Sequence, residues 1–241
     1  MDISLIIPAY NEVERIGETL ETAAGWFASQ KYSAEIIVVD DGSSDDTTAI
    51  VREYQSRAPT PILLEALPEN RGKGAAVQAG MVRLATGAFR FFYDADASTP
   101  IEEIARCLPL FDSGADIVIG SRALPDSQIE KRQVWYREFM GRCFNHIERV
   151  LRLTRFKDTQ CGFKGFTARA AEQCFSRQTV FRFSFDVEIL FIAEKYGLRV
   201  EEIPVRWINC PKSRVNPVTD AGRMFLDLIA IRAKDLAGKY D

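Results

Sequence analysis

Two aspartates, Asp94 and Asp96, follow the mostly apolar run Phe89 to Tyr93 and are separated only by Ala95. Side chains alternate between the two faces of a β-strand, so both carboxylates would leave the edge of a sheet together. Hard divalent cations such as Mg²⁺ and Mn²⁺ bind carboxylate and phosphate oxygens together. The pair therefore predicts a metal site, formed by Asp94 and Asp96, that holds a bound diphosphate. The alternative is an acidic turn that ends a buried strand.

The composition excludes several classes of protein. The chain has 241 residues, of which 46% are hydrophobic, enough for the core of one large α/β domain. No window approaches the ~20 apolar residues that span a bilayer, and the first residues do not look like a signal peptide, so we expect a cytoplasmic protein. Five cysteines without a Cys-x-x-Cys pair, and one histidine, predict reduced thiols and no zinc site.

The distribution of charge suggests an anionic partner. The net charge of -3 argues against general nucleic-acid binding. From Lys131 to Lys157, however, there are eight basic residues against two acidic ones. Such a local excess within an acidic protein favours a negatively charged ligand or surface.

Short apolar strands alternate with stretches of helical spacing in the first half of the chain. We expect strands at Ile3 to Ile7, Glu35 to Val39, Ile62 to Leu67, Phe89 to Tyr93 and Asp116 to Ile119. This alternation predicts an α/β fold with a doubly wound, mostly parallel sheet. Ligands of such sheets gather beyond the carboxyl ends of the strands. Four polar clusters follow strands: Pro8 to Glu12, Asp40 with Asp41, Asn70 to Lys73, and Asp94 with Asp96.

The second half of the chain predicts two amphipathic helices. One runs from about Trp135 to Leu151 and has an arginine-rich polar face, and the other lies between about Met224 and Leu236. Basic amphipathic helices often lie at a membrane surface. They can equally pack on the sheet with a solvated basic face, and the sequence leaves both interpretations open.

The polar clusters, together with three later motifs, resemble the inverting family 2 glycosyltransferases of the GT-A fold. The branch they are similar to transfers sugars to polyprenyl phosphates, as dolichyl-phosphate β-glucosyltransferases and, next, dolichyl-phosphate mannose synthases do. The resemblance extends from roughly Ile3 to Arg232. Its motifs are Pro8-Ala9-Tyr10-Asn11-Glu12, Val39-Asp40-Asp41-Gly42-Ser43, Asn70-Arg71-Gly72-Lys73-Gly74, Asp94-Ala95-Asp96, Gly120-Ser121-Arg122, Asp158-Thr159-Gln160-Cys161-Gly162-Phe163-Lys164 and Phe185-Asp186-Val187-Glu188.

The resemblance implies a glycosyltransferase domain over residues 1–215 and a C-terminal amphipathic helical tail over residues 216–241. Asp96 is expected to bind the metal directly, and Asp94 to contact the ribose or, through water, the metal. The third metal ligand stays open, because Ser98 stands where the mannose synthases carry a longer polar side chain. Asp41 is expected to cap a loop. The residues implied in binding the nucleotide sugar are Pro8, Ala9, Tyr10, Glu12, Asp40, Lys73, Asp94, Ala95 and Asp96.

An acceptor phosphate, with its second pKa near ~6, is already ionised at neutral pH and needs no general base. It needs cations that hold it in line with the sugar. Asp186 is expected to orient one of these cations or to favour a helix N-terminus. The cations implied are Arg122, Arg137 and Lys164, with Lys212 and Arg214 as a lid over the donor phosphates. The residues implied in catalysis are Asp96, Arg122, Asp158, Gln160 and Lys164.

The resemblance thus implies a metal-dependent enzyme that uses Mg²⁺ or Mn²⁺ to move a hexose, first of all glucose from UDP-glucose, onto a polyprenyl or dolichyl phosphate. It would work on the cytoplasmic side, attached peripherally to the inner face of the membrane. The alternative donor is GDP-mannose. A nucleotide-sugar-binding module without catalysis is a further alternative, although the segment Asp158 to Lys164 argues for an acceptor side. A nucleotidyltransferase would need an N-terminal glycine-rich phosphate loop, which Pro8 to Glu12 is not.

Overall fold

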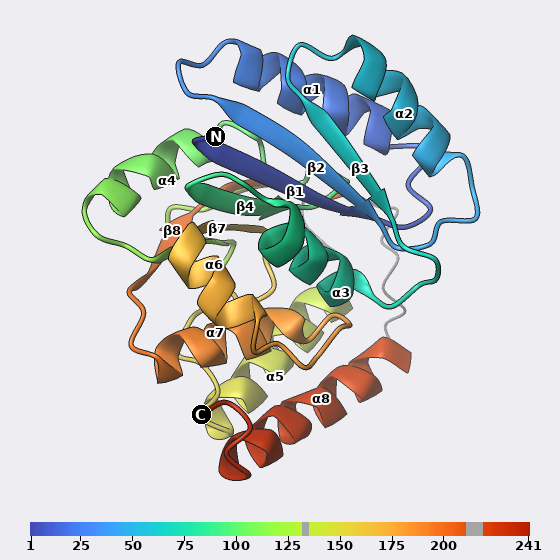
Figure 1. The fold of residues 1–241 in the computed structure, drawn as a ribbon. Coiled ribbons are helices and arrows are strands. Elements are labelled where there is room, and N and C mark those ends of the chain that lie inside the picture. The colour runs from blue at the N-terminus through green and yellow to red at the C-terminus, as the bar shows by residue number, and fades with distance from the viewer. Residues whose placement is uncertain (132–134, 211–218) are drawn as a thin grey trace.

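The computed structural model describes residues 1–131, 135–210 and 219–241, and the side chains of residues 131, 135–139 and 219–221 lie outside the description. A twisted central sheet runs through the molecule, and helices cover both of its faces (Figure 1). Within the described chain this sheet has seven strands in the order β3-β2-β1-β4-β7-β5-β8. They are β1 (Ile3–Ala9), β2 (Ala34–Asp40), β3 (Ile62–Ala66), β4 (Phe89–Tyr93), β5 (Ile117–Ser121), β7 (Phe163–Thr167) and β8 (Val200–Pro204).

The helices begin and end close to the turn residues that separate the strands. Residues 79–84 continue α3 as a π-helical segment. A two-stranded sheet joins β6 (Gln128–Lys131) to β9 (Arg206–Ile208). The α-helices are α1 (Ile16–Ala28), α2 (Thr47–Arg57), α3 (Lys73–Gln78), α4 (Glu103–Asp112), α5 (Trp135–Val150), α6 (Ala168–Phe175), α7 (Phe185–Lys195) and α8 (Thr219–Leu236).

The predicted α/β, mostly parallel sheet is confirmed, with one strand reversed. β1 pairs in parallel with β2 and β4, β2 with β3, and β5 with β8. β7 lies between β4 and β5 and is antiparallel to both. The sequence did not predict β7, because its residues belong to a motif that the resemblance assigned to the acceptor side. The reversed strand brings residues 158–162 beside the end of β4.

The two faces of the sheet carry separate apolar cores. Successive residues of β4 point into different cores. Phe91 and Tyr93 pack in the core beneath α1 and α4, whereas Phe92 packs in the core beneath α7. This period of two places Asp94 and Asp96 at the end of a strand that is fixed on both faces.

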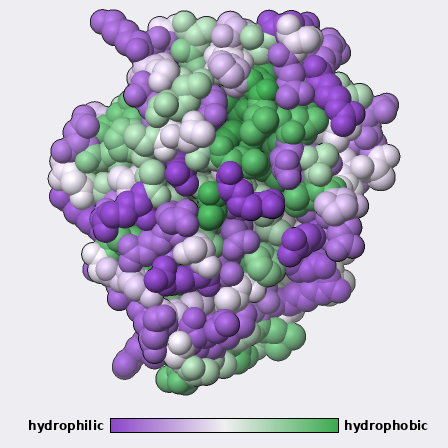
Figure 2. All heavy atoms as spheres, in the orientation of Figure 1, coloured by the Kyte–Doolittle hydropathy of each residue, from purple (hydrophilic) through white to green (hydrophobic). Residues whose placement is uncertain are grey.

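Helices α5 and α8 pack on the body of the protein and also expose apolar side chains. Ile147 of α5 and Leu228 of α8 contact the same core, and Tyr240, beyond α8, is fully buried in it. Leu226 and Leu236 are nevertheless 64% and 78% exposed. Figure 2 shows apolar residues gathered along the lower margin, where α8 lies in Figure 1. None of the described helices is long and apolar enough to cross a bilayer. The boundary between residues 1–215 and 216–241 stays a prediction.

Candidate active site

The loops that follow β1 and β2 are bound to each other at the carboxyl edge of the sheet. The amide N–H of Asn11 donates to Oγ of Ser43 at 2.8 Å, and the amide N–H of Ser44 donates to Oδ1 of Asn11 at 2.8 Å. Asn11 has a φ of 54°, a left-handed conformation that asparagine tolerates better than most residues. The two predicted polar clusters therefore form one framework.

Asp40 and Asp41 have different tasks in this framework. The buried carboxylate of Asp40 accepts hydrogen bonds from the amide N–H of Ser43, at 2.9 Å, and from the Ser43 hydroxyl. Asp41 accepts from the amide N–H groups of Arg71 and Gly72, each at 2.8 Å. Burial raises the pKa of Asp41. Asp41 thus caps the glycine-bearing loop, as expected, and Asp40 holds Ser43, which in turn contacts the loop after β1.

The other residues of the predicted donor cluster lie around this framework. Ala9 is buried, whereas Tyr10 is 40% exposed. The amide N–H of Glu12 donates to the Thr47 hydroxyl at 2.8 Å. Pro8, half-buried, continues β1 in parallel pairing with β2.

The glycine-bearing loop before α3 rests on a segment that the sequence did not single out. Gly72 has a φ of 105°, and a Cβ at this position would overlap with the carbonyl oxygen of Phe181. The side-chain amide of Gln178 donates to the carbonyl oxygen of Gly74 at 3.0 Å. Residues 178–181 therefore pack against the glycines on both sides of Lys73. The only signal in the sequence was the pair of glycines around Lys73, which indicates close backbone contact.

Lys73 forms an ion pair with the first aspartate of the acidic pair. Its Nζ lies 2.6 Å from Oδ1 of Asp94. Burial lowers the pKa of Lys73, but the carboxylates of Asp94 and Asp186 outweigh that effect, so the pKa is raised. The amide N–H of Asp94 donates to the carbonyl oxygen of Gly162 at 3.1 Å. Asp94 therefore links the donor loop to the segment that leads into β7.

Asp96 is held differently from Asp94. Its Oδ1 accepts from the amide N–H of Ser98 at 3.0 Å, and its Oδ2 lies 3.9 Å from Nη1 of Arg15. Burial, and then the charge of Asp94, raise the pKa of Asp96. Arg15 also pairs with Glu12, which joins the loop after β1 to the acidic pair. Arg15 belongs to none of the sequence motifs and was not predicted. Between the aspartates, buried Ala95 accepts a hydrogen bond from the Thr19 hydroxyl at 2.8 Å.

The two aspartates fit a hard cation whose coordination a substrate completes. Within the described part of the chain, no cluster of three or more His, Cys, Asp or Glu side chains is arranged to hold a metal ion. Mg²⁺ sites that hold phosphates usually take one or two carboxylates and fill the remaining positions with phosphate and water oxygens. Lys73 pairs with Asp94 at 2.6 Å, whereas Arg15 lies 3.9 Å from Asp96, so Asp96 is the carboxylate that is more available to a metal.

Arg122 and Asp158 form a two-point ion pair, and Arg122 also lies near Asp94. Burial would lower the pKa of Arg122, but the carboxylates of Asp158 and Asp94 outweigh that effect and raise it. Nε and Nη2 of Arg122 donate to Oδ2 and Oδ1 of Asp158 at 2.7 and 2.9 Å, and the amide N–H of Arg122 donates to Oδ2 at 2.9 Å. Burial by itself would raise the pKa of Asp158, but the Arg122 guanidinium lowers it to about 2. The ring of Trp207 lies 5.4 Å from the guanidinium carbon. Arg122 is therefore fixed in direction while its side chain keeps 28% of its surface exposed.

Gln160 lies next to this pair, where its amide N–H donates to Oδ1 of Asp158 at 3.2 Å. The amide N–H groups of Lys157 and Asp158 in turn donate to Oε1 of Glu202 at 3.0 and 2.9 Å. Glu202 lies in β8, so the segment with Asp158 and Gln160 is anchored to the edge of the sheet.

Lys164 is buried beneath the site. Its Nζ lies 2.7 Å from both Oδ1 of Asp186 and the carbonyl oxygen of Cys161, and 4.9 Å from the centre of the Phe92 ring. The residue has 0% of its surface exposed. Burial raises the pKa of Asp186, although Lys164 acts against this effect. The expected contact of Lys164 with an acceptor phosphate has no open path in this arrangement, so its role stays a proposal. Of the alternatives for Asp186, the structure shows pairing with Lys164.

Three predicted cations fall outside the description. Lys212 and Arg214 lie among residues 211–218, and Arg137 lies in α5 at a position whose side chain is not described. The expectation that these residues hold phosphates stays untested. Among the described residues, the site combines four carboxylates with four cations in pairs. They are Asp94 with Lys73, Asp96 with Arg15, Asp158 with Arg122, and Asp186 with Lys164.

Known proteins of similar sequence carry one consistent description. The profile of Glycosyl transferase family 2 matches residues 4–175. A dolichyl-phosphate beta-glucosyltransferase of Dictyostelium discoideum is 35% identical over 249 residues, which cover 98% of this chain and 75% of that protein. The protein of the same description from Homo sapiens is 30% identical over 250 residues, covering 99% of this chain and 77% of the relative.

Solved structures share the fold. Glucosyl-3-phosphoglycerate synthase from Mycobacterium tuberculosis, crystallised with Mn²⁺, UDP and glucosyl-3-phosphoglycerate, superposes with a TM-score of 0.69 at 17% identity. The superposition covers 95% of this chain and 78% of that chain. This likeness confirms the predicted sheet architecture.

Proposed function

The chain belongs to glycosyl transferase family 2, and from this premise we propose that it moves glucose from UDP-glucose to a polyprenyl phosphate such as dolichyl phosphate. The relatives named as dolichyl-phosphate beta-glucosyltransferases, which align with almost the whole chain, support this donor and acceptor. The observation that carries the proposal is structural. Gly162, just before β7, accepts a hydrogen bond from Asp94. Asp94 both pairs with Lys73 and lies near enough to Arg122 to help Asp158 raise the pKa of that guanidinium against the effect of burial.

The donor side of the proposal assigns roles to the framework after β1 and β2. Asp40 and the loop Pro8 to Glu12 hold the nucleoside, because a carboxylate there accepts hydrogen bonds from base or ribose donors. Lys73, paired with Asp94, would orient the ribose or the diphosphate. Asp96 would bind Mg²⁺ or Mn²⁺ directly, and Asp94 would contribute the second carboxylate. When bound, that ion would neutralise the charge that develops on the leaving nucleoside diphosphate.

The acceptor side of the proposal rests on Arg122. Asp158 fixes the guanidinium at two points, which leaves its remaining N–H groups to bind a phosphate in a defined direction. The phosphate is ionised at neutral pH, so no base has to remove a proton before it attacks the sugar. Gln160 lies beside this pair, and Lys164 supports the site from beneath through Asp186. Inversion at the anomeric carbon follows if attack and departure occur on opposite faces.

We further propose that the protein works at the cytoplasmic face of a membrane, where a polyprenyl phosphate resides. The apolar outer face of α8 supports this proposal, since Leu226, Ile229 and Leu236 are exposed. Residues 216–241 would then act as a membrane-contacting tail of the glycosyltransferase domain. Truncation after Asn216 should weaken sedimentation with liposomes, but it also removes the buried Tyr240, so Leu226→Ser/Leu236→Ser, which changes only exposed side chains, is the decisive variant. Undiminished sedimentation of this variant would remove the proposed role.

The test of the reaction incubates pure protein with Mg²⁺ or Mn²⁺, a panel of UDP- and GDP-sugars, and a short polyprenyl phosphate. We expect a glucosylated lipid with UDP-glucose, and none when the metal is chelated. A product formed only with GDP-mannose would show that GDP-mannose, and not UDP-glucose, is the donor. Nucleotide-sugar binding without any product would favour a binding module.

A variant tests the proposed metal ligand. Asp96→Ala should lower transfer at least 10²-fold, while the melting temperature changes little. Asp112→Asn, on the exposed end of α4, is the matched control. Wild-type turnover in Asp96→Ala would remove the metal role of Asp96.

A further inference from the structure

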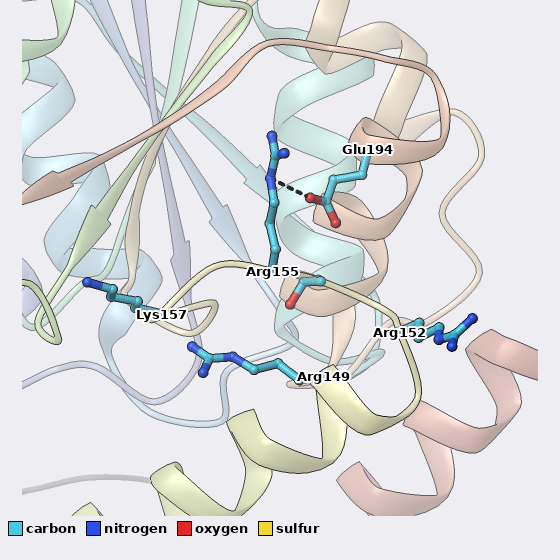
Figure 3. Close-up of a pocket in the computed structure, with 6 residues that line it drawn as sticks. Arg149, Arg152, Arg155, Lys157 and Glu194 are labelled. Carbon is cyan, nitrogen blue, oxygen red and sulfur yellow. Dashed lines mark ion pairs between the residues drawn. The ribbon is translucent and has the colours of Figure 1, made fainter.

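A basic pocket opens at the end of α5. Its volume is about 560 Å³, and its lining consists of Arg149, Arg152, Thr154, Arg155, Lys157 and Glu194 (Figure 3). We call residues 149–157 the basic turn. The lining contains four basic side chains and one carboxylate, an excess of three positive charges. None of these residues belongs to the donor or acceptor groups described above.

The positive charge of the basic turn is largely unpaired. Nε of Arg155 lies 3.0 Å from Oε1 of Glu194. Within the described part of the chain, no ion pair involves Arg149, Arg152 or Lys157. An uncompensated cluster of this kind attracts anions to a protein whose net charge is negative.

The backbone of the basic turn is firmly held. Leu153 and Phe156 are buried in the protein, and the Thr154 hydroxyl donates to the buried Glu148 at 3.1 Å. The side-chain amide of Asn145 donates to the carbonyl oxygen of Lys157 at 2.7 Å. Buried residues thus alternate with the exposed basic residues, so the turn presents its cations from a fixed base.

Arg152 occupies a position where the backbone favours glycine. Its φ is 53°, and the amide N–H of the next residue, Leu153, donates to the carbonyl oxygen of Glu148 at 2.9 Å, as at many helix ends that carry glycine. An arginine in this left-handed conformation is strained relative to glycine. Strained residues are often found where the side chain has a function.

The arrangement of the cations suits a surface with many phosphates better than a single small anion. Arg149 and Lys157 extend to one side of the turn, and Arg152 extends to the other side, toward α8 (Figure 3). Val150, next to Arg149, is 66% exposed. Helix α8, on which Leu226 and Leu236 are exposed, lies beside the end of α5 in Figures 1 and 3. Basic and apolar side chains together are typical of a protein surface that binds anionic lipid.

We propose that the basic turn binds the phosphate headgroups of anionic phospholipids and seats the protein on a membrane. The proposal rests on the proposed function only in that a polyprenyl phosphate is found in a membrane, and it names the residues that make the contact. A lipid surface offers phosphates to both sides of the turn and accepts Val150 and the outer face of α8 between them.

The test measures binding of the full chain to vesicles of phosphatidylcholine with and without phosphatidylserine. The double variant Arg149→Gln/Arg152→Gly removes two charges, and glycine suits the backbone at position 152, so folding is preserved. Each basic residue at an anionic surface contributes roughly fivefold to binding, so we expect about 25-fold weaker binding to phosphatidylserine vesicles. High salt should weaken the wild type in the same direction.

The matched control, Arg52→Gln/Arg57→Gln, removes the same charge from α2 at the opposite end of the molecule (Figure 1). Unchanged vesicle binding by Arg149→Gln/Arg152→Gly, or an equal loss in the control, would overturn the proposal. If the wild type binds inositol hexakisphosphate, the double variant does not, and vesicle binding is the same for both, the pocket binds soluble phosphates and the lipid proposal is wrong. Transfer to a short acceptor in detergent should be the same for both variants and the wild type, so loss of that activity is a separate result that concerns the proposed function.

Discussion

Gly162 and Asp94 lie so close that a Cβ at position 162 would overlap with the Asp94 carboxylate. The amide N–H of Asp94 donates to the carbonyl oxygen of Gly162, and the next residues, Tyr93 and Phe163, pair in the antiparallel ladder of β4 and β7. A glycine of one motif therefore makes room for a carboxylate of another. This contact connects the segment proposed for the acceptor side to the two aspartates proposed to hold the metal.

Gly162→Ala should displace Asp94 from Lys73 and from the second aspartate. A shift of about 1 Å in a reacting group can cost ~10²-fold in rate, and we expect a loss of transfer of that order. The quantity to measure is kcat/KM for UDP-glucose, together with the melting temperature. Gly25→Ala is the control, because a Cβ there meets nothing within 4 Å. Activity in Gly162→Ala equal to that of the control would show that the Asp94 position is not critical.

The ion pair between Arg122 and Asp158 should act as one unit. Asp158→Asn or Arg122→Met leaves a partly buried charge without its partner, which typically costs about 3–5 kcal/mol of unfolding free energy. The double variant should lose much less than the sum of the two single losses. Urea unfolding of the four proteins measures the coupling. Transfer activity should fall to a similar level in all three variants, and strictly additive losses would contradict the pairing.

Stability should depend on pH through Glu148. This carboxyl is fully buried, accepts from the hydroxyls of Thr159 and Thr154 at 2.9 and 3.1 Å, and burial raises its pKa from 4.5 to about 7. The unfolded chain releases this proton near the ordinary value, so between about pH 5 and pH 7 it binds fewer protons than the folded protein. The stabilisation is thus complete below the ordinary pKa and is lost as the pH rises through about 7.

Glu148→Gln should remove this slope. The comparison is the urea midpoint of wild type and variant at several values from about pH 5 to pH 8. Glu53→Gln, an exposed change on α2, serves as the control and should leave the slope intact. Parallel pH profiles for Glu148→Gln and the wild type would rule out this residue as the origin.

The buried hydroxyl of Tyr240 should stabilise the packing of α8. It donates to Oε1 of Glu188 at 2.5 Å, and the amide N–H groups of Thr179 and Val180 donate to Oε2 at 2.8 and 2.7 Å. Tyr240→Phe removes one donor from a buried carboxylate and should cost about 1–3 kcal/mol. The control is Tyr32→Phe, because the buried Tyr32 hydroxyl lacks a hydrogen-bond partner within the described structure.

Thermal unfolding of both variants checks this prediction, with Tyr240→Phe melting lower and Tyr32→Phe at or above the wild type. Residues 178–181 also support the loop of Lys73. The KM for the donor should therefore rise in Tyr240→Phe and not in Tyr32→Phe. Equal stability of the two variants would mean that the contact with Glu188 contributes nothing.

The sequence predicted the first four strands, which the structure shows at β1 to β4, because each combines an apolar run with a polar or glycine-bearing end. The fifth expected strand, Asp116 to Ile119, corresponds to β5 at Ile117–Ser121. The sequence also predicted that Asp40, Lys73 and Asp94 lie at the same edge of the sheet, since parallel strands bring their carboxyl ends together. Both predictions depend on local spacing and turn chemistry, which are readable along the chain.

Tertiary structure alone decided the place of β7 and the partners of the charged residues. The segment Phe163–Thr167 is too short for its sequence to indicate the direction of a strand. It lies between β4 and β5 and pairs antiparallel with both. Arg122 and Asp158 are 36 residues apart, and Lys164 and Asp186 are 22 apart. Pairing over such distances depends on which elements pack together and which charges become buried, and neither is encoded in the spacing of neighbouring residues.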